Sequence, residues 1–231
     1  MKRVKIAPSL MCADFISLGP ELDIMKEMDV DYLHIDIMDG RYVPNFTLGP
    51  DFCRRLVSYS PIPLDIHLMI EDPDAHLRKF AAFPGAVVSF HPETSRHPLR
   101  TIDLIRSLGA RAGIAVDPAM PASWLSEMLP SVSLVCVMTV NPGYAGQTLI
   151  PEMLDKVRRI ADMTAAAGQP VEIEVDGNVS WENIPQLVEA GGDVLVTGTS
   201  SLYDGKAGLA QNIERLRSLI GRPATDAGRH G

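Results

Sequence analysis

Three segments that are far apart in this chain each carry a histidine or an aspartate near the C-terminal end of a short apolar run. They are 34–40 (HIDIMDG), 64–69 (LDIHLM) and 172–177 (EIEVDG). Side chains alternate between the two faces of a strand, so residues two apart share a face. If these faces converge, two imidazoles and two carboxylates meet, which is a complete ligand set for a divalent transition metal. The candidate metal ligands are His34, Asp36, His67 and Asp176.

Each of these residues has a simpler interpretation when it is taken alone. A single histidine on a strand is usually a hydrogen-bonded core residue, and an aspartate at a strand end usually caps the next turn. We expect such structural roles for His76, His97, Asp117 and Asp65. That interpretation fails for the group of four, because burying these groups is costly unless they are paired or bind a cation. Glu174 leaves two roles open, a hydrogen bond from a ligand histidine or a paired charge inside the fold.

The two aspartates also suggest a reaction. Asp36 and Asp176 come from separate segments and would approach a bound molecule from opposite sides. One would remove a proton from a carbon next to a carbonyl group, and the other would return a proton to the opposite face. A metal between them would stabilise the negative charge of the enediolate as a Lewis acid. The pattern therefore predicts two-base epimerisation with these two aspartates as the catalytic residues.

The elements that must position these residues alternate along the chain. Apolar segments predict strands near 4–9, 31–37, 62–69, 86–91, 112–116, 133–140, 171–176 and 193–197. Amphipathic segments predict helices near 17–28, 50–58, 73–82, 98–108, 121–129, 151–167, 181–190 and 207–219. The strands are almost continuously apolar, as expected for strands that are buried on both faces.

Eight strand–helix repeats in this length indicate an α/β fold, a single-domain (β/α)8 TIM barrel. In this fold, active sites lie at the C-terminal ends of the strands, which is where the four candidate ligands fall. A doubly wound sheet is the alternative, but it does not easily bring the second, third and seventh strands together. We expect the barrel over residues 1–220 and a disordered tail over 221–231, where the periodicity stops.

Glycine-containing turns follow the last three predicted strands, over 141–147, 176–180 and 197–201. Loops at this place in a barrel commonly bind phosphate, and glycine lets backbone N–H groups approach an anion. These loops contain no lysine or arginine, so amides and hydroxyls would hold the phosphate. The glycines of 143–148 also predict a lid that excludes water. The predicted phosphate-binding residues are Gly143, Tyr144, Ala145, Gly146, Gly177, Asn178, Gly198, Thr199 and Ser200.

Composition and charge exclude several partners. The formal net charge is -8 and the sequence has no basic patch, so we expect no nucleic-acid partner. We find no apolar run long enough to span a bilayer and no signal-peptide pattern, which predicts a cytoplasmic protein without a membrane partner. Cys12, Cys53 and Cys136 are scattered and form no CxxC pair, which predicts small buried apolar residues in a reducing compartment.

Longer motifs carry a resemblance to a known family. They are 6–11 (IAPSLM), 34–40, 43–45 (VPN), 64–69, 138–143 (MTVNPG) and 174–177 (EVDG). With these motifs the chain resembles the ribulose-phosphate 3-epimerase family over its whole length short of the tail. The resemblance implies a barrel enzyme that inverts C3 of a ketose phosphate, with one divalent metal ion (zinc, iron, manganese or cobalt) on the four ligands named above.

The resemblance also assigns further residues. It implies that Ser9 and His67 contact the substrate and that Met38, Met69 and Met138 form a sulfur-rich lining around the enediolate. Barrel packing remains a good interpretation for Met11. The His91-Pro92-Glu93 segment matches the family as well, without an assigned role. The family further implies a homo-oligomer, either a dimer or a hexamer.

All departures from the commonest pattern of that family lie in the phosphate loops. Tyr144 and Ala145 stand where the pattern has Phe-Gly, Asn178 where it has Gly, and Gly198-Thr199 where it has Ala-Gly. A missing glycine can move an N–H group that would meet the phosphate. The departures are similar to D-allulose-6-phosphate 3-epimerases. The substrate pair is therefore D-ribulose 5-phosphate/D-xylulose 5-phosphate or D-allulose 6-phosphate/D-fructose 6-phosphate, and the loops favour the hexulose.

Other functions stay open. One is a different barrel enzyme on sugar phosphates, an aldolase or a decarboxylase of the orotidine-phosphate type. The decarboxylase pattern has a lysine flanked by aspartates at strand ends, whereas Ile37 follows Asp36 here and no predicted strand ends in lysine. The other is a non-catalytic barrel that binds a sugar phosphate. Such a barrel would not need two acid/base carboxylates at its metal.

Overall fold

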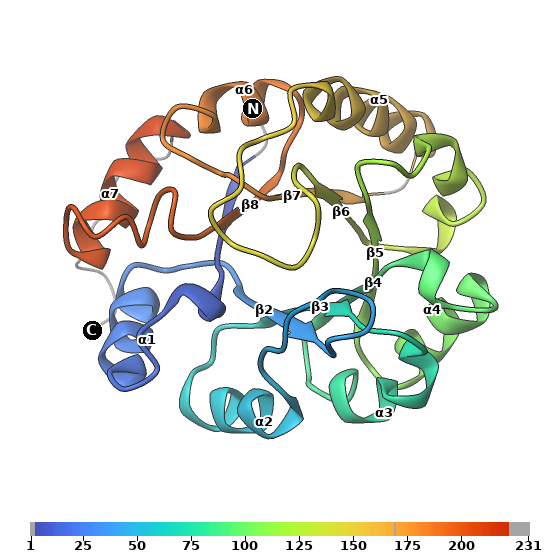
Figure 1. Cartoon of the computed structure of the whole chain (residues 1–231), viewed down its shortest axis with the longest axis horizontal. Coiled ribbons are helices and arrows are strands. Elements are labelled where there is room, and N and C mark those ends of the chain that lie inside the picture. Colours follow the sequence, from blue (N-terminus) through green and yellow to red (C-terminus); the bar gives the residue numbers. More distant parts are fainter. Residues whose placement is uncertain (1–2, 169, 222–231) are drawn as a thin grey trace.

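Eight parallel strands form a barrel with helices around it in the computed structural model, which describes residues 3–168 and 170–221 (Figure 1). The strands are β1 (Lys5–Pro8), β2 (Leu33–Met38), β3 (Leu64–Met69), β4 (Val87–Phe90), β5 (Arg111–Val116), β6 (Leu134–Met138), β7 (Glu172–Asp176) and β8 (Val194–Thr197). The predicted single-domain (β/α)8 barrel is confirmed. Of the predicted tail 221–231, residues 222–231 lie outside the described part of the chain.

The barrel closes between its first two strands. The strands pair in the order β1-β8-β7-β6-β5-β4-β3-β2, so only the β1–β2 junction lacks a full ladder. A parallel bridge between Ser9 and His34 spans this junction. The backbone N–H groups of Asp31 and Tyr32 also donate to the carbonyl of Ile6, each at 3.2 Å. The polar end of β2 is thereby fixed beside the end of β1.

The helices cover the outside of the barrel. They are α1 (Leu18–Glu27), α2 (Pro50–Tyr59), α3 (Leu77–Phe80), α4 (Pro98–Ser107), α5 (Glu152–Ala166), α6 (Ile184–Glu189) and α7 (Leu209–Leu219). α2 and α4 begin with a proline at their first position, where its missing N–H has no intrahelical partner to lose.

Two of the predicted helices were wrong in type or length. The predicted helix 121–129 is instead a pair of 3₁₀ turns, η4 (Ala122–Leu125) and η5 (Leu129–Ser131). Pro130 cannot donate a helical hydrogen bond, and Ser123 and Ser126 compete for local backbone groups. The predicted helix 73–82 divides into a 3₁₀ turn, η2 (Pro73–Ala75), and the four-residue α3.

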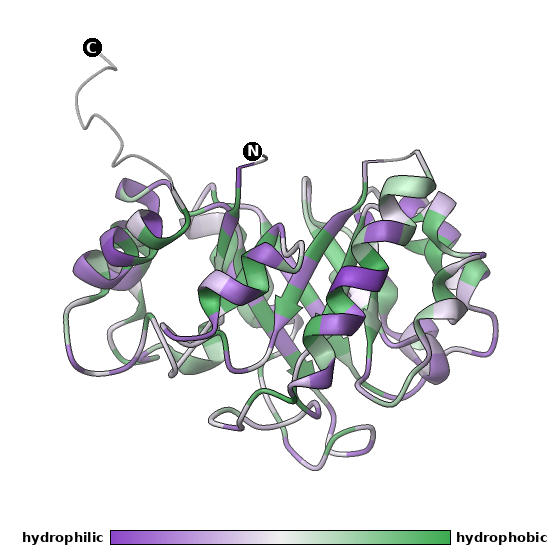
Figure 2. Ribbon diagram, turned by 90° about the horizontal axis from the view of Figure 1, so that it is seen from above, coloured by the Kyte–Doolittle hydropathy of each residue, from purple (hydrophilic) through white to green (hydrophobic). Residues whose placement is uncertain are grey.

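The alternation along β2 shows how the sequence builds both sides of the barrel wall. Leu33, Ile35 and Ile37 pack into the large apolar layer between strands and helices. His34 and Asp36 lie between them in the sequence and face inward. In Figure 2 the strands are mostly apolar, and the outer faces of the helices carry hydrophilic residues. Burying each large aliphatic side chain stabilises the fold by about 1.5–3 kcal/mol, which helps offset the polar groups held inside.

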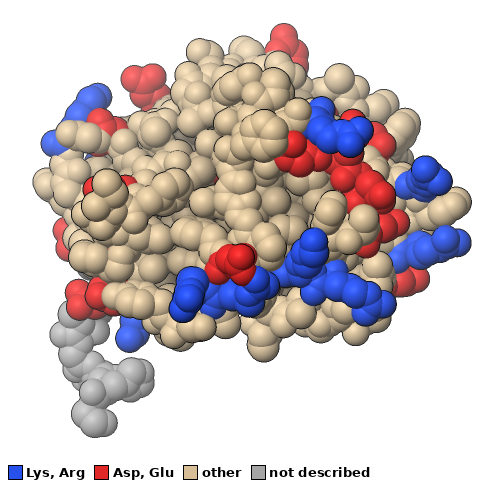
Figure 3. Space-filling model, turned by 60° about the horizontal axis from the view of Figure 1, so that its bottom comes forward, with Lys and Arg blue, Asp and Glu red and all other residues tan. Residues whose placement is uncertain are grey.

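Charged side chains are unevenly distributed over the face drawn in Figure 3. In Figure 3, basic side chains run along the lower edge and the right of the face, acidic side chains lie among and above them, and the middle is uncharged. This face therefore has no broad basic surface of the kind that tracks a nucleic-acid backbone. Within the described residues, none of the helices has the length and apolar character that a membrane span requires.

Candidate active site

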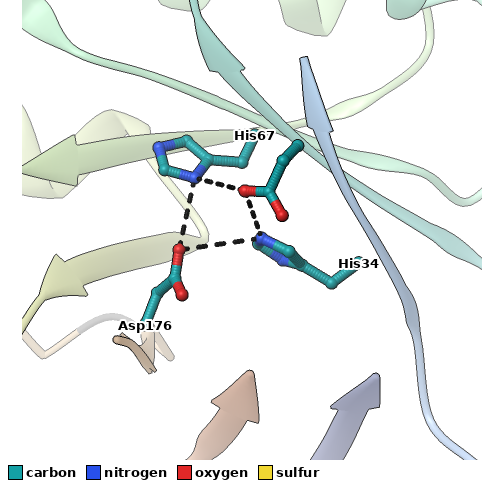
Figure 4. Close-up of side chains that lie close together, drawn as sticks. His34, His67 and Asp176 are labelled. Carbon is teal, nitrogen blue, oxygen red and sulfur yellow. Dashed lines mark hydrogen bonds and ion pairs between the residues drawn. The ribbon is translucent and has the colours of Figure 1, made fainter. Parts of the chain in front are cut away.

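Four side chains from three strands meet inside the C-terminal end of the barrel. His34 and Asp36 lie on β2, His67 on β3 and Asp176 at the end of β7. Asp36 is in register with His67 across the β2–β3 ladder, which sets these two side by side. Figure 4 shows His34, His67 and Asp176 pointing toward one another. The structure thus brings all four predicted metal ligands together.

The distances within this group are those of ligands around a single ion. Asp36 Oδ1 lies 3.3 Å from His34 Nε2 and 3.5 Å from His67 Nδ1. Asp176 Oδ2 lies 3.8 Å and 3.5 Å from the same two nitrogens. One donor atom from each residue falls within 4.8 Å of all the others.

The donor set and an unpaired atom fit a divalent metal. His67 is fully buried, and its Nδ1 has no hydrogen-bond partner among the described residues. A buried imidazole nitrogen without a partner is costly, and a cation at the centre of the group would satisfy it. Two nitrogens and two carboxylate oxygens suit zinc, iron, manganese or cobalt.

Charges within the group shift its protonation. Burial opposes a charge on His67, but the carboxylates of Asp176 and Asp36 raise its pKa to about 9. Burial likewise opposes a charge on His34, and Asp36 and Asp65 still raise its pKa well above the usual range. Burial opposes the charged form of Asp36, yet the two imidazoles hold the pKa of its carboxyl below the usual range. A metal would therefore replace protons on the two imidazoles when it binds.

The partner that orients His34 is Asp65, a fully buried residue for which the sequence predicted a structural role. His34 Nδ1–H donates to Asp65 Oδ2 at 2.6 Å, so Nε2 is the nitrogen left for the metal. Glu174 Oε1 is 4.0 Å from the same Nδ1 and makes no hydrogen bond to it. Burial, together with the charge of Asp65, raises the pKa of the Glu174 carboxyl well above its usual range. Of the two roles left open for Glu174, the structure therefore does not support a hydrogen bond from His34.

Ser9 connects the group to the space above it. Its hydroxyl donates to Asp36 Oδ2 at 2.7 Å, and it lines the same pocket as Asp176. Of the three predicted lining methionines, Met38 and Met138 line this pocket. Met69 is only 1% exposed and packs behind them against Met38.

One pocket takes in the whole predicted phosphate end. Sequence reasoning assigned Met11 to packing and all three cysteines to buried positions, but Met11 and the half-buried Cys12 also line this pocket. The predicted phosphate-binding residues that line it are Gly143, Tyr144, Ala145, Gly146, Gly177, Asn178, Gly198, Thr199 and Ser200.

The departures from the family pattern all occupy backbone conformations that suit them. Asn178 has a φ of 48°, in the left-handed region that asparagine tolerates better than most residues. Ala145 and Thr199 are not among the described residues with positive φ. At Gly198, an added Cβ would lie 3.1 Å from Cys12 Sγ, so the neighbouring thiol accounts for the smaller residue there. The loop backbone can therefore keep its amides near the pocket despite the substitutions.

Two loops meet over the mouth of the barrel. In Figure 1 the loop after β6 lies across the end of the strands. Asn45, in the loop after β2, donates from Nδ2 to the Gly143 carbonyl at 2.9 Å, and Tyr144 donates its hydroxyl to the Pro44 carbonyl at 3.2 Å. The predicted lid segment is thus held against a second loop.

Structural roles were also expected for Asp117, His76 and His97. Of these, Asp117 is connected to the site through His91. Its Oδ1 lies 3.2 Å from Nδ1 of His91, whose Nε2 is 2.9 Å from His67 Nε2. His97 is exposed at the start of α4, and His76 is half-buried before α3, so neither is a core residue.

Comparison with known proteins identifies the family of the chain. The model of the Ribulose-phosphate 3 epimerase family matches residues 5–202. The chain belongs to this family. Ribulose-phosphate 3-epimerase 2 of Cupriavidus necator is 43% identical over 222 residues, covering 94% of this chain and 92% of that protein. The ribulose-phosphate 3-epimerase of Escherichia coli K12 is 37% identical over 223 residues, covering 96% and 98%. The protein is therefore an isomerase, an epimerase that acts on carbohydrates.

Solved structures add a more distant likeness. Orotidine 5'-phosphate decarboxylase from Pyrococcus horikoshii OT3 superposes with a TM-score of 0.64 at 15% identity, covering 94% of this epimerase and all (100%) of that chain. At this identity the likeness shows the shared barrel alone. It lends no support to a decarboxylase.

Proposed function

We propose that this epimerase is metal-dependent and interconverts D-ribulose 5-phosphate and D-xylulose 5-phosphate by two-base proton transfer at C3. The observation that carries the proposal is the pair Asp36 and Asp176, grouped with two buried imidazoles next to a pocket that Asp176 lines together with the loops after β6, β7 and β8. The names of the curated relatives support the five-carbon substrate. When bound, a divalent metal in this group supplies Lewis-acid stabilisation of negative charge.

The residues of the chain divide the proton transfer between them. Asp36 and Asp176 come from strands that are not neighbours in the barrel, so they can serve opposite faces of C3. One removes the proton and the other returns one to the opposite face, which inverts the carbon. Ser9 keeps Oδ2 of Asp36 in place through its hydroxyl. Met38 and Met138 present buried, polarizable side chains beside the reacting carbon and exclude water from it.

At the opposite end of the pocket, backbone amides would bind the phosphate. The segments 141–147, 176–180 and 197–201 contain no lysine or arginine, and Gly143, Gly146 and Gly177 all have positive φ. Such conformations turn successive N–H groups toward one side, where an anion can accept from them. Bound phosphate would therefore set the position of C3 relative to Asp36 and Asp176 without a charged side chain from these segments.

Proton exchange at C3 in heavy water, followed by NMR, tests the proposal. We expect wild type to incorporate deuterium at C3 and to form the epimer. Asp36→Asn and Asp176→Asn should lower epimerisation by about 10²–10⁴-fold, as expected for loss of one acid/base group. Either variant may be compared with Asp155→Asn, which changes an exposed carboxylate on α5 and should leave turnover unchanged. Normal epimerisation by both active-site variants would exclude the two-base scheme.

The same assay, run side by side with D-allulose 6-phosphate, addresses chain length. The departures in the phosphate loops predict a hexulose preference, whereas the names of the relatives favour the pentulose. Faster exchange with D-ribulose 5-phosphate would support the proposal. Faster exchange with the six-carbon ketose would assign a hexulose specificity to the loops.

We further propose a cytoplasmic homo-oligomer, a dimer or a hexamer, that needs neither nucleic acid nor a membrane. Light scattering on the purified protein would give the mass, and one chain mass of 25.1 kDa would contradict the oligomer.

A further inference from the structure

A second imidazole lies behind His67, on the side away from the metal group. His91 follows β4 and is fully buried. Its Nε2 lies 2.9 Å from Nε2 of His67, and the two rings are stacked with centroids 5.0 Å apart. The family resemblance gave the His91-Pro92-Glu93 segment no role. The contact with His67 gives it one.

Two nitrogens at this distance must share a single proton, and the metal site decides which one carries it. His67 Nδ1 faces the carboxylates of Asp36 and Asp176 at 3.5 Å each. To bind a metal, that nitrogen must be free of its proton. A neutral His67 then carries its proton on Nε2 and donates it to His91 Nε2. His91 in turn must carry its own proton on Nδ1.

The surroundings of His91 favour that arrangement. Its Nδ1 lies 3.2 Å from Asp117 Oδ1 and 3.6 Å from Glu93 Oε1. Neither His91 Nδ1 nor Asp117 Oδ1 makes a well-formed hydrogen bond to any other described residue. A proton on Nδ1 therefore lies near two carboxylate oxygens, and Asp117 Oδ1 accepts no hydrogen bond from another described residue.

Both carboxylates are themselves held in place. Lys156 of α5 donates from Nζ to the backbone carbonyls of Asp117 at 2.9 Å and Met120 at 2.8 Å. Tyr42 donates its hydroxyl to Glu93 Oε1 at 2.8 Å, and its ring lies against the His91 ring with centroids 4.7 Å apart. Each of the two acceptors is therefore held by a contact of its own residue.

The same three residues, His91, Glu93 and Asp117, have the spacing of a second metal site. The proton count argues against that use. If His91 bound an ion through Nδ1 while accepting from His67 through Nε2, it would have to lose both ring protons. A hydrogen-bonded neutral imidazole needs no such loss.

We propose that His91, with Asp117 and Glu93, is a positioning residue that keeps the proton of His67 on Nε2 and so reserves Nδ1 for the metal. The inference rests on the proposed metal-dependent function. His34 is oriented directly by the Asp65 carboxylate. In this proposal His67 is oriented by a carboxylate indirectly, through the ring of His91.

Cobalt binding tests this without relying on turnover. His91→Leu removes the acceptor, and His91→Gln keeps one near the same place. His97→Leu removes an exposed imidazole and serves as the control. Each protein, checked for folding by circular dichroism, is titrated with Co²⁺ against a competing chelator while the visible absorption is recorded. We expect His91→Leu to weaken Co²⁺ binding by about 10–100-fold, with His91→Gln and the control within about threefold of wild type.

Nitrogen-15 NMR of the zinc-loaded wild type gives an independent readout of the proton positions. We expect a proton on Nε2 of His67 and on Nδ1 of His91. A proton on His91 Nε2, or undiminished cobalt affinity in His91→Leu, would overturn the positioning role. Two Co²⁺ per chain, with one lost in His91→Leu, would overturn it in favour of a second metal site. Wild type that binds no Co²⁺ would instead remove the proposed metal function and the inference together.

Discussion

The two ends of the pocket are built in different ways. At the metal end, the side chains of His34, Asp36 and His67 project from neighbouring strands, and all are at most 4% exposed. At the phosphate end, the loops after β6, β7 and β8 present backbone, and Tyr144 is 54% exposed. The chemistry of the metal end therefore depends on residue type. The chemistry of the phosphate end depends on backbone conformation, because several residue types can place a backbone amide in the same position.

Removing the metal is the largest change that the metal end can undergo. We expect exhaustive chelation to lower turnover by on the order of 10³-fold or more, because the charge that develops next to the carbonyl loses its Lewis acid. Adding back zinc, iron, manganese or cobalt should restore activity to differing degrees. Turnover is measured on protein whose metal content has been verified by mass spectrometry. Full activity of metal-free protein would mean that the two aspartates act without a cation.

At the phosphate end, a single added methyl group should impair the enzyme to a comparable extent if the methyl group distorts the backbone. Gly177 has a φ of 117°, and an added Cβ would lie 2.6 Å from Val140 Cγ2 and 2.9 Å from Val140 N. We expect Gly177→Ala to destabilise the fold by about 2–4 kcal/mol and to raise KM at least about tenfold. Urea unfolding and steady-state kinetics measure the two effects.

The matched variant is Gly146→Ala, in the same pocket. Gly146 has a φ of 80°, but no atom lies within 4 Å of an added Cβ. The strain of a positive φ remains, about 1 kcal/mol, without the collision. Gly205→Ala, also with positive φ and open space but outside the pocket, reports that strain alone. Equal KM values for the variants at 177 and 146 would show that the β7 loop does not hold the phosphate.

This difference also explains what the sequence could and could not predict. The eight strand–helix repeats predicted the barrel. The alternation of His34 and Asp36 on an apolar strand helped to predict the metal group, because strand geometry fixes which side chains share a face. The contact between Asp65 and His34 was missed, since it depends on the register of two strands rather than on one pattern. The role of Asn178 was also beyond sequence reasoning, because asparagine can keep or lose the conformation of the glycine it replaces.

The pH dependence of stability gives a smaller, graded test of the metal end. Burial opposes a charge on His67, while Asp176 and Asp36 raise its pKa to about 9, above the usual 6.5. A raised folded-state pKa means that this contribution to stability is present in full below pH 6.5 and is lost as the pH rises through 9. In metal-loaded protein, the proton that competes with the metal at His67 has already been released. The stabilisation that the metal adds, relative to metal-free protein, therefore grows as the pH rises from 6.5 to 9.

We thus expect the difference in Tm between metal-loaded and metal-free protein to widen between pH 6.5 and 9.5, by the equivalent of about 1–3 kcal/mol. Thermal unfolding of both forms across this range measures it, and the loaded protein is the control for all other titrating groups. A difference that stays constant with pH would mean that no proton competes with the metal at His67.

The smallest effect should come from restoring the family glycine in the phosphate loop. Asn178→Gly keeps a positive φ accessible but removes the hydrogen bonds to Ser200 Oγ at 3.2 Å and from Asn183 Nδ2 at 2.7 Å. We expect about 1 kcal/mol of lost stability and KM for D-ribulose 5-phosphate within about threefold of wild type. Asn178→Val, which places a β-branched residue at the same φ, should be clearly worse in both respects.

These two variants decide whether the contrast between the ends of the pocket holds. If backbone conformation is what matters, glycine at 178 behaves like asparagine toward ketose phosphates of five and six carbons, and only valine impairs both. A tenfold change in the preference between the two substrates in Asn178→Gly, with unchanged stability, would mean that the amide side chain itself reads the length of the sugar. The phosphate end would then select its ligand by residue type, as the metal end does.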